Sequence, residues 1–99
     1  MVVIDDGSTD GSLEQVRDLV NSHPEVELIS HPTNLGKGAA VRTGLKRARG
    51  KYTIIQDADL EYDPADYQKL LAAAREHGVR VVYGSRVLAA QPASYRRYY

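Results

Sequence analysis

The segment Q-D-A-D-L-E-Y-D-P, residues 56 to 64, crowds four carboxylates directly behind the apolar run Y-T-I-I. Side chains of like charge held this close repel one another unless a cation lies among them. An oxygen-ligated divalent ion such as Mg²⁺ or Mn²⁺ satisfies both the charge and the geometry of such a cluster. In an extended segment residues i and i+2 point the same way, so Asp57 and Asp59 can reach one ion and Glu61 continues the series. The segment therefore predicts a metal site.

The same acidic segment has a second interpretation, as a solvated loop that runs into a helix. Asp63 precedes Pro64, a residue that suits the first position of a helix, and an aspartate there can cap the N–H groups of the first turn. An isolated Asp-x-Asp is a weak signal for metal binding. On these residues alone both interpretations stay open.

Two further segments carry groups that bind anions. N-L-G-K-G, residues 34 to 38, lies at the expected start of a helix, where glycines admit a ligand to the backbone and N–H groups attract negative charge, with Lys37 or Arg42 adding a positive one. It lacks the spacing of a Walker A loop, and an ordinary tight turn is the alternative. Arg86 follows a strand-ending Gly-Ser pair and could clamp a phosphate through two N–H groups, or simply be solvated.

The three histidines, His23, His31 and His77, give no comparable signal. Each lies near a turn or the end of an expected element, and their spacing is not that of metal ligands. We expect them to be capping or exposed residues. No Ser/His/Asp nucleophile can be nominated either.

These clusters must be positioned by strands that alternate with helices. Short β-branched or aromatic runs predict strands at residues 2–4, 26–30, 52–56 and 79–83. Apolar residues at helical spacing predict helices over residues 13–20, 40–48 and 64–77. The alternation predicts an α/β fold, an open and mostly parallel sheet with flanking helices. Ligands bind at the carboxyl ends of such strands, where the polar clusters all follow, so we expect one shared site.

Composition limits the classes of protein to consider. The 99 residues suit one domain with a modest core, and the absence of cysteine excludes disulfides and thiolate sites. Thirteen basic and thirteen acidic residues cancel, which argues against a nucleic-acid partner. No apolar run approaches the roughly 20 residues that cross a bilayer, and no signal peptide is visible. The expected localisation is the cytoplasm.

One alternative is a signalling domain rather than an enzyme. Asp5 with Asp6, Asp57 and Ser85 match the acidic pocket, the phosphoacceptor and the switch hydroxyl of a response-regulator receiver domain. That class needs a different loop after Asp57 and a Lys-Pro strand end that the chain does not show.

Four ordered segments together resemble the nucleotide-sugar half of family 2 glycosyltransferases, of the dolichol-phosphate mannose and glucose synthase type. They are V-V-I-D-D-G-S-T-D-G-S, N-L-G-K-G-A-A-V-R-T-G, Y-T-I-I-Q-D-A-D-L-E-Y-D-P and V-V-Y-G-S-R, within residues 2 to 86. The resemblance implies a GT-A, Rossmann-like domain over residues 1–86 and the start of an acceptor region over residues 87–99. It also implies a chain incomplete at both ends.

The resemblance further implies roles for individual residues. Asp57 and Asp59 would meet the divalent ion, Mg²⁺ or Mn²⁺, and the donor diphosphate, and Glu61 would be a further metal ligand. The other implied donor contacts are Asp5, with Asp6 behind it, on the nucleoside, Lys37 near the base or phosphates, and Arg86 on the diphosphate. Asp57, Asp59 and Arg86 would act in catalysis.

The implied reaction is inverting transfer of mannose or glucose from a GDP- or UDP-sugar to a polyprenyl phosphate. Relatives continue into membrane-associated segments, so the full-length protein is expected at the cytoplasmic face of a membrane. They also begin with an earlier strand that lies inside the sheet beside residues 2 to 5. Without that strand we expect the 99 residues to be weakly stable or self-associated, and a nucleotide-binding relic without transfer activity is an alternative.

Overall fold

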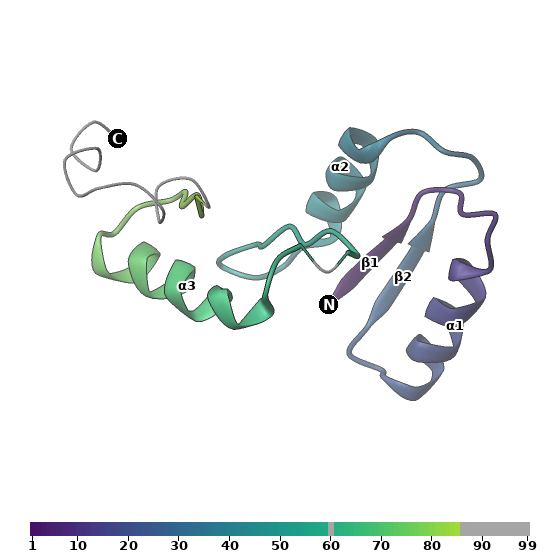
Figure 1. The fold of residues 1–99 in the computed structure, drawn as a ribbon, viewed down its shortest axis with the longest axis horizontal. Helices are drawn as coiled ribbons and strands as arrows, with labels where there is room; N and C mark the ends of the chain where they lie inside the picture. Colours follow the sequence, from purple (N-terminus) through teal and green to yellow (C-terminus); the bar gives the residue numbers. More distant parts are fainter. Residues whose placement is uncertain (60, 86–99) are drawn as a thin grey trace. The chain divides into compact units, whose positions relative to one another are not determined.

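Two parallel strands with a helix beside each form the first part of the molecule (Figure 1). The computed structural model describes residues 1–59 and 61–85. The chain divides into two units, the first of residues 1–55 and the second from residue 56 onward. The first unit contains β1 (Val2–Asp5), α1 (Ser12–Ser22), β2 (Glu27–Ser30) and α2 (Lys37–Arg47). The second contains the 3-10 turn η1 (Pro64–Asp66), which runs into α3 (Tyr67–Glu76).

The sheet of the first unit confirms the predicted α/β class with parallel strands and flanking helices. β1 and β2 pair in parallel, with Val2 opposite Glu27 and Asp5 opposite Ser30. α2 packs on β1 and α1 packs on β2. The parallel register brings the carboxyl ends of the two strands to the same edge, which is where ligands bind in sheets of this kind.

Burial in the first unit includes a charged residue. Asp5 is 7% exposed, the same fraction as Val26, the most buried apolar side chain of this unit. A carboxylate removed from water is stable only when its oxygens accept hydrogen bonds. The end of β1 must therefore be surrounded by donors.

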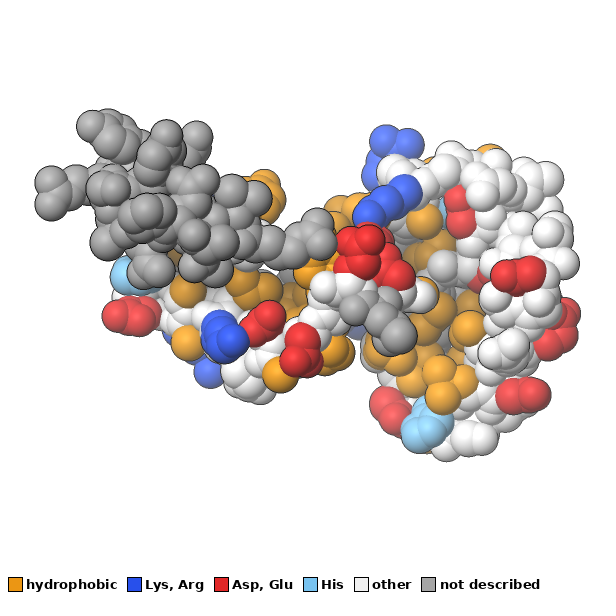
Figure 2. Space-filling view, viewed as in Figure 1, with side chains coloured by type: hydrophobic (Ala, Val, Ile, Leu, Met, Phe, Trp, Pro, Cys, Tyr) orange, Lys and Arg blue, Asp and Glu red, His pale blue; other side chains and the backbone are white. Residues whose placement is uncertain are grey.

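The predicted strands at residues 52–56 and 79–83 are wrong for the described structure, because both segments run as irregular chain. Ile55 is 58% exposed and Val81 is 62% exposed. Figure 2 shows apolar side chains on the surface of both parts of the molecule. An apolar run favours a strand through its side chains, but a strand also needs a second segment to pair with its backbone. Among the described residues, β1 and β2 are the only paired strands.

The third helix begins as the sequence predicts. Asp63 is extended, and its carboxylate accepts a hydrogen bond from the backbone N–H of Ala65 at 2.8 Å, with Pro64 in the first position of η1. The Asp-Pro pair is thus a helix cap, as expected. No helix in the described part of the chain is long and apolar enough to cross a membrane.

Candidate functional site

The turn that follows β1 fits against the loop that follows β2 with no space for a side chain. Gly7 has φ of 74°, in the left-handed region that favours glycine. A Cβ atom at this position would lie 2.6 Å from the carbonyl carbon of Thr33 and 2.7 Å from the backbone nitrogen of Asn34. The close approach sets the two loops against each other at the carboxyl edge of the sheet.

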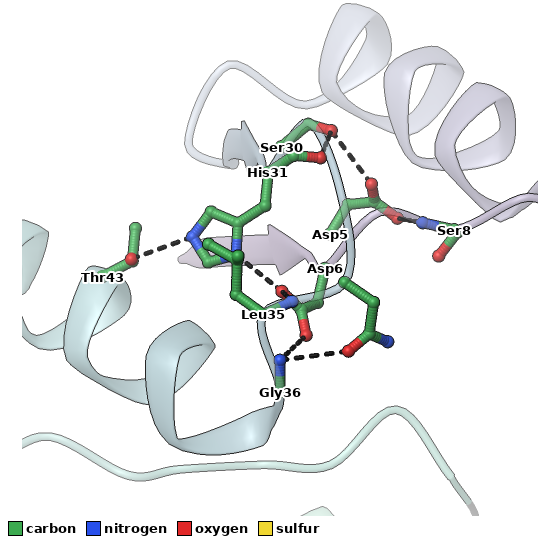
Figure 3. Close-up of polar contacts among 9 residues, drawn as sticks. Asp5, Asp6, Ser8, Ser30, His31, Leu35, Gly36 and Thr43 are labelled. Carbon is green, nitrogen blue, oxygen red and sulfur yellow. Dashed lines mark hydrogen bonds and ion pairs between the residues drawn. The ribbon is translucent and has the colours of Figure 1, made fainter.

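The buried Asp5 joins the ends of the two strands (Figure 3). Its Oδ2 accepts from the hydroxyl of Ser30, its partner in the sheet register, at 3.0 Å, and its Oδ1 accepts from the backbone N–H of Ser8 at 3.3 Å. Hydrogen bonding by the side chain of Ser8, reinforced by Ser30, lowers the pKa of Asp5 against the opposing effect of burial. Asp5 is therefore an ionised, hydrogen-bonded group inside the fold.

The carboxylate of Asp6 accepts hydrogen bonds from the last two backbone amides before α2. Oδ1 accepts from the backbone N–H of Leu35 at 3.0 Å, and Oδ2 accepts from that of Gly36 at 2.7 Å. A hydrogen bond from His31 and then the Leu35 amide lower the pKa of Asp6. The amides of Leu35 and Gly36 are thus occupied by a carboxylate of the chain itself. Binding of a ligand anion by this loop, with Lys37 or Arg42 adding charge, stays a prediction.

His31 is a largely buried polar residue whose contacts sequence reasoning missed. We expected a capping or exposed side chain, but its ring is only 10% exposed and lies between two polar partners. Nδ1 is 2.6 Å from Oδ1 of Asp6, and Nε2 is 3.0 Å from Oγ1 of Thr43 on α2. No signal in the sequence alone indicated this contact: Asp6 and His31 follow the paired residues Asp5 and Ser30, and that pairing is known only from the structure.

In the second unit the predicted metal residues lie on a turn before η1. The carboxylate of Asp59 accepts from the backbone N–H of Glu61 at 3.0 Å. Gln56 donates to the carbonyl oxygen of Asp57 at 2.8 Å and accepts from the hydroxyl of Tyr67, on α3, at 2.8 Å. Tyr67 thus holds Gln56, which in turn holds the backbone of the Asp-x-Asp turn. The sequence did not indicate the contact between Tyr67 and Gln56.

The oxygen donors of this turn fit a divalent ion in chemistry. No three carboxylates or histidines of residues 1–59 and 61–85 are gathered as metal ligands. Mg²⁺ is commonly held by one or two carboxylates together with the phosphates of a substrate, so Asp57 and Asp59 as a pair of ligands stay a prediction. Glu61 as a third ligand stays a prediction.

The predicted site residues are divided between the two units of the chain. Asp5 and Asp6 belong to the first unit, with Lys37 at the first position of α2 immediately beyond Gly36. Asp57 and Asp59 belong to the second unit. Arg86 and the expected acceptor segment, residues 87–99, lie outside the described residues.

Acid should weaken the first unit, because the pKa values of Asp5 and Asp6 are lower in the folded chain than their ordinary value of 3.8. The unfolded chain then binds protons at a higher pH than the folded chain. The stabilisation is complete above the ordinary value and is lost as the pH falls through the lower, folded values. Thermal unfolding between pH 7 and pH 2 should show a steeper acid loss for the wild type than for Asp6→Asn, which lacks one of these groups. Equal slopes would contradict this origin.

Comparison with known proteins gives a consistent result. The model of the family described as "Glycosyl transferase family 2" matches residues 1–98. A dolichyl-phosphate beta-glucosyltransferase of Trichomonas vaginalis is 41% identical over 59 residues, which cover 60% of this chain and 18% of that protein. A dolichol-phosphate mannosyltransferase of Saccharomyces cerevisiae is 34% identical over 77 residues, 78% of this chain and 29% of that protein.

A third relative, from Mycobacterium tuberculosis, carries only the description "Putative glycosyltransferases" and is 39% identical over 88 residues, covering 85% of this chain and 25% of that protein. The chain thus spans between 18% and 29% of the length of these curated relatives. No solved structure gives a significant match. The receiver-domain alternative is set aside, because the family model matches nearly the whole sequence: the chain belongs to glycosyl transferase family 2.

Proposed function

We propose that the protein carrying this chain transfers a hexose, mannose or glucose, from a GDP- or UDP-sugar to a polyprenyl phosphate with inversion, assisted by Mg²⁺ or Mn²⁺. The observation that carries the proposal is the match to family 2 together with two relatives named as dolichyl-phosphate sugar transferases. Family membership implies the GT-A, Rossmann-like fold, and the parallel pair β1 and β2 with α1 and α2 beside it fits that fold.

The donor end of the reaction depends on charge. A nucleoside diphosphate departs with growing negative charge, which a bound divalent ion would neutralise. Asp57 and Asp59 would hold that ion through oxygen ligands. Lys37 and Arg86 would pair with the diphosphate as fixed positive charges.

The nucleoside end of the donor would meet Asp5 at the carboxyl edge of the sheet. Each carboxylate oxygen has two acceptor positions, so an oxygen that already accepts from Ser8 or Ser30 can take a second hydrogen bond from a base or ribose. Asp6 would act behind it, because its oxygens hold the loop before Lys37. In this arrangement Asp5 would orient the donor directly, and Asp6 would do so through the loop that it holds.

The acceptor explains why no nucleophilic side chain or dedicated base is required. A polyprenyl phosphate is already an anionic oxygen nucleophile at neutral pH, so little or no proton removal accompanies its attack. Such an acceptor resides in a membrane, and we therefore propose that the protein works at the cytoplasmic face of one, through segments beyond those described.

Calorimetry with GDP and UDP, each with Mn²⁺ and with excess chelator, tests the donor half. The protein should be used as it is expressed, with any flanking sequence retained. Binding of one nucleotide that depends on Mn²⁺ supports the proposal, and the nucleotide that binds names the donor. Absence of binding by both contradicts it.

Transfer of radiolabelled mannose or glucose from its nucleotide sugar to a short polyprenyl phosphate tests the acceptor half of the reaction. Metal-dependent nucleotide binding without transfer would identify a relic that retains only nucleotide affinity.

A further inference from the structure

The ring of His31 joins three elements at the carboxyl edge of the sheet (Figure 3). It stands directly after β2, reaches Asp6 directly after β1, and reaches Thr43 in the middle of α2. Both contacts are between partly buried groups. A single side chain therefore relates the ends of both strands to the helix that packs beside them.

The hydrogen-bond roles in this network fix the tautomer of His31. An ionised Asp6 has only acceptor oxygens, so Nδ1 must carry the hydrogen and donate to Oδ1. In the neutral ring Nε2 is then an acceptor, and the hydroxyl of Thr43 donates to it. The Thr43 hydroxyl, which can donate or accept, thus satisfies Nε2 in the ring form that Asp6 requires.

The network ends at the backbone that precedes Lys37. The carboxylate of Asp6 that His31 contacts through Oδ1 also accepts from the amide of Leu35, at Oδ1, and from the amide of Gly36, at Oδ2. His31 also contacts α2 itself, through Thr43, which lies six positions beyond the start of the helix at Lys37. The loop and the helix are consequently fixed at two points by one ring.

We propose that His31 is a positioning residue for donor binding: through Asp6 and Thr43 it holds the loop of residues 35–37 and the start of α2 where the nucleotide is received. The inference rests on the proposed function and assigns to it a residue that does not itself touch the donor. Loss of the ring leaves Asp6 with its two amides but without lateral support. The loop then samples other positions, and donor affinity falls while the chemical step is retained.

The test compares three substitutions in the protein as expressed. His31→Ala removes both contacts and should raise the donor KM, and the Kd for the nucleotide that binds, by about tenfold or more, the effect of losing a hydrogen bond to a charged group. His31→Asn keeps an N–H near the position of Nδ1 and should recover most of the loss. Thr43→Val keeps the side-chain shape, removes the hydroxyl and should raise the donor KM about threefold.

The matched control is His23→Ala. His23 also pairs with a carboxylate, Glu25, at 3.1 Å, but both side chains are exposed and lie at the opposite end of β2. This variant should leave the donor KM unchanged. For all four variants the KM of the acceptor and kcat should stay within a few-fold of the wild type, a separation that a general loss of folded protein does not produce.

Several outcomes distinguish the inference from the function on which it rests. A folded His31→Ala variant with wild-type donor KM overturns the inference alone. A wild type that binds neither GDP nor UDP overturns the proposed function and the donor role together. If His31→Ala does not fold, Thr43→Val decides: a donor KM equal to that of the wild type overturns the inference. Shifted amide resonances of Leu35 and Gly36 in Thr43→Val, with a raised donor KM, support it.

Discussion

Sugar transfer is expected to fall by about 100- to 1,000-fold when Asp57 or Asp59 is replaced by asparagine, because charge neutralisation by a metal ion lowers the barrier by several kcal/mol. The substitutions remove a negative charge and leave the turn in place. Oδ1 of asparagine can still accept from the N–H of Glu61, as Asp59 does at 3.0 Å. The carbonyl oxygen of Asp57, which accepts from Gln56, is untouched. Donor binding titrated with Mn²⁺ and transfer rates measure the loss.

Asp63→Asn is the matched control for this prediction. It removes the same charge from the same acidic segment, but the carboxylate of Asp63 caps η1 through the N–H of Ala65 at 2.8 Å. Asparagine caps a helix about as well as aspartate, so stability should change little. The Mn²⁺ dependence of donor binding should match the wild type. If the Asp57 and Asp59 variants bind donor as tightly as the wild type, and chelator makes no difference to any of them, the metal role of these residues is wrong.

The second large effect is expected at Gly7. In Gly7→Ala the new Cβ would lie 2.6 Å from the carbonyl carbon of Thr33, a backbone atom that cannot rotate away. The left-handed conformation, with φ of 74°, costs an alanine about 1–2 kcal/mol, and forced displacement of the neighbouring loop adds about 1–3 kcal/mol. The free energy of unfolding, from urea denaturation, should therefore fall by about 2–5 kcal/mol.

Gly11→Ala separates the two contributions to this loss. Gly11 also has positive φ, at 87°, but no atom lies within 4 Å of the position of a new Cβ. Its substitution should cost only the conformational part, about 1–2 kcal/mol. The difference between the two variants measures the close approach of the loops after β1 and β2. Equal losses would show that the loops separate without cost.

The acidic turn of the second unit illustrates a prediction that was possible from local chemistry. The cap involves three consecutive residues, Asp63, Pro64 and Ala65. Their capping role follows from the backbone groups that any helix leaves unpaired. The Asp-x-Asp spacing is equally local. What the spacing did not reveal is that Tyr67 on α3 supports Gln56, since that contact depends on how the helix folds back on the turn.

The strand predictions for residues 52–56 and 79–83 failed for a related reason. Their β-branched and aromatic residues favour extended chain, and that preference is a property of each segment alone. Pairing is a property of two segments, and none of the described residues pairs with either. β1 and β2 carry the same kind of sequence and do form strands, because each has the other as its partner.

The spacing of residues along the chain was enough to predict the α/β class, the parallel strands and the cap of η1. The family was predicted from the resemblance of four ordered motifs. The contact of Asp6 with the amides before α2, and that of His31 with Asp6 25 positions away, became visible only in the folded chain. Those contacts depend on the register between two strands and on the packing of α2 beside them. The order of residues along the chain specifies neither the register nor the packing directly.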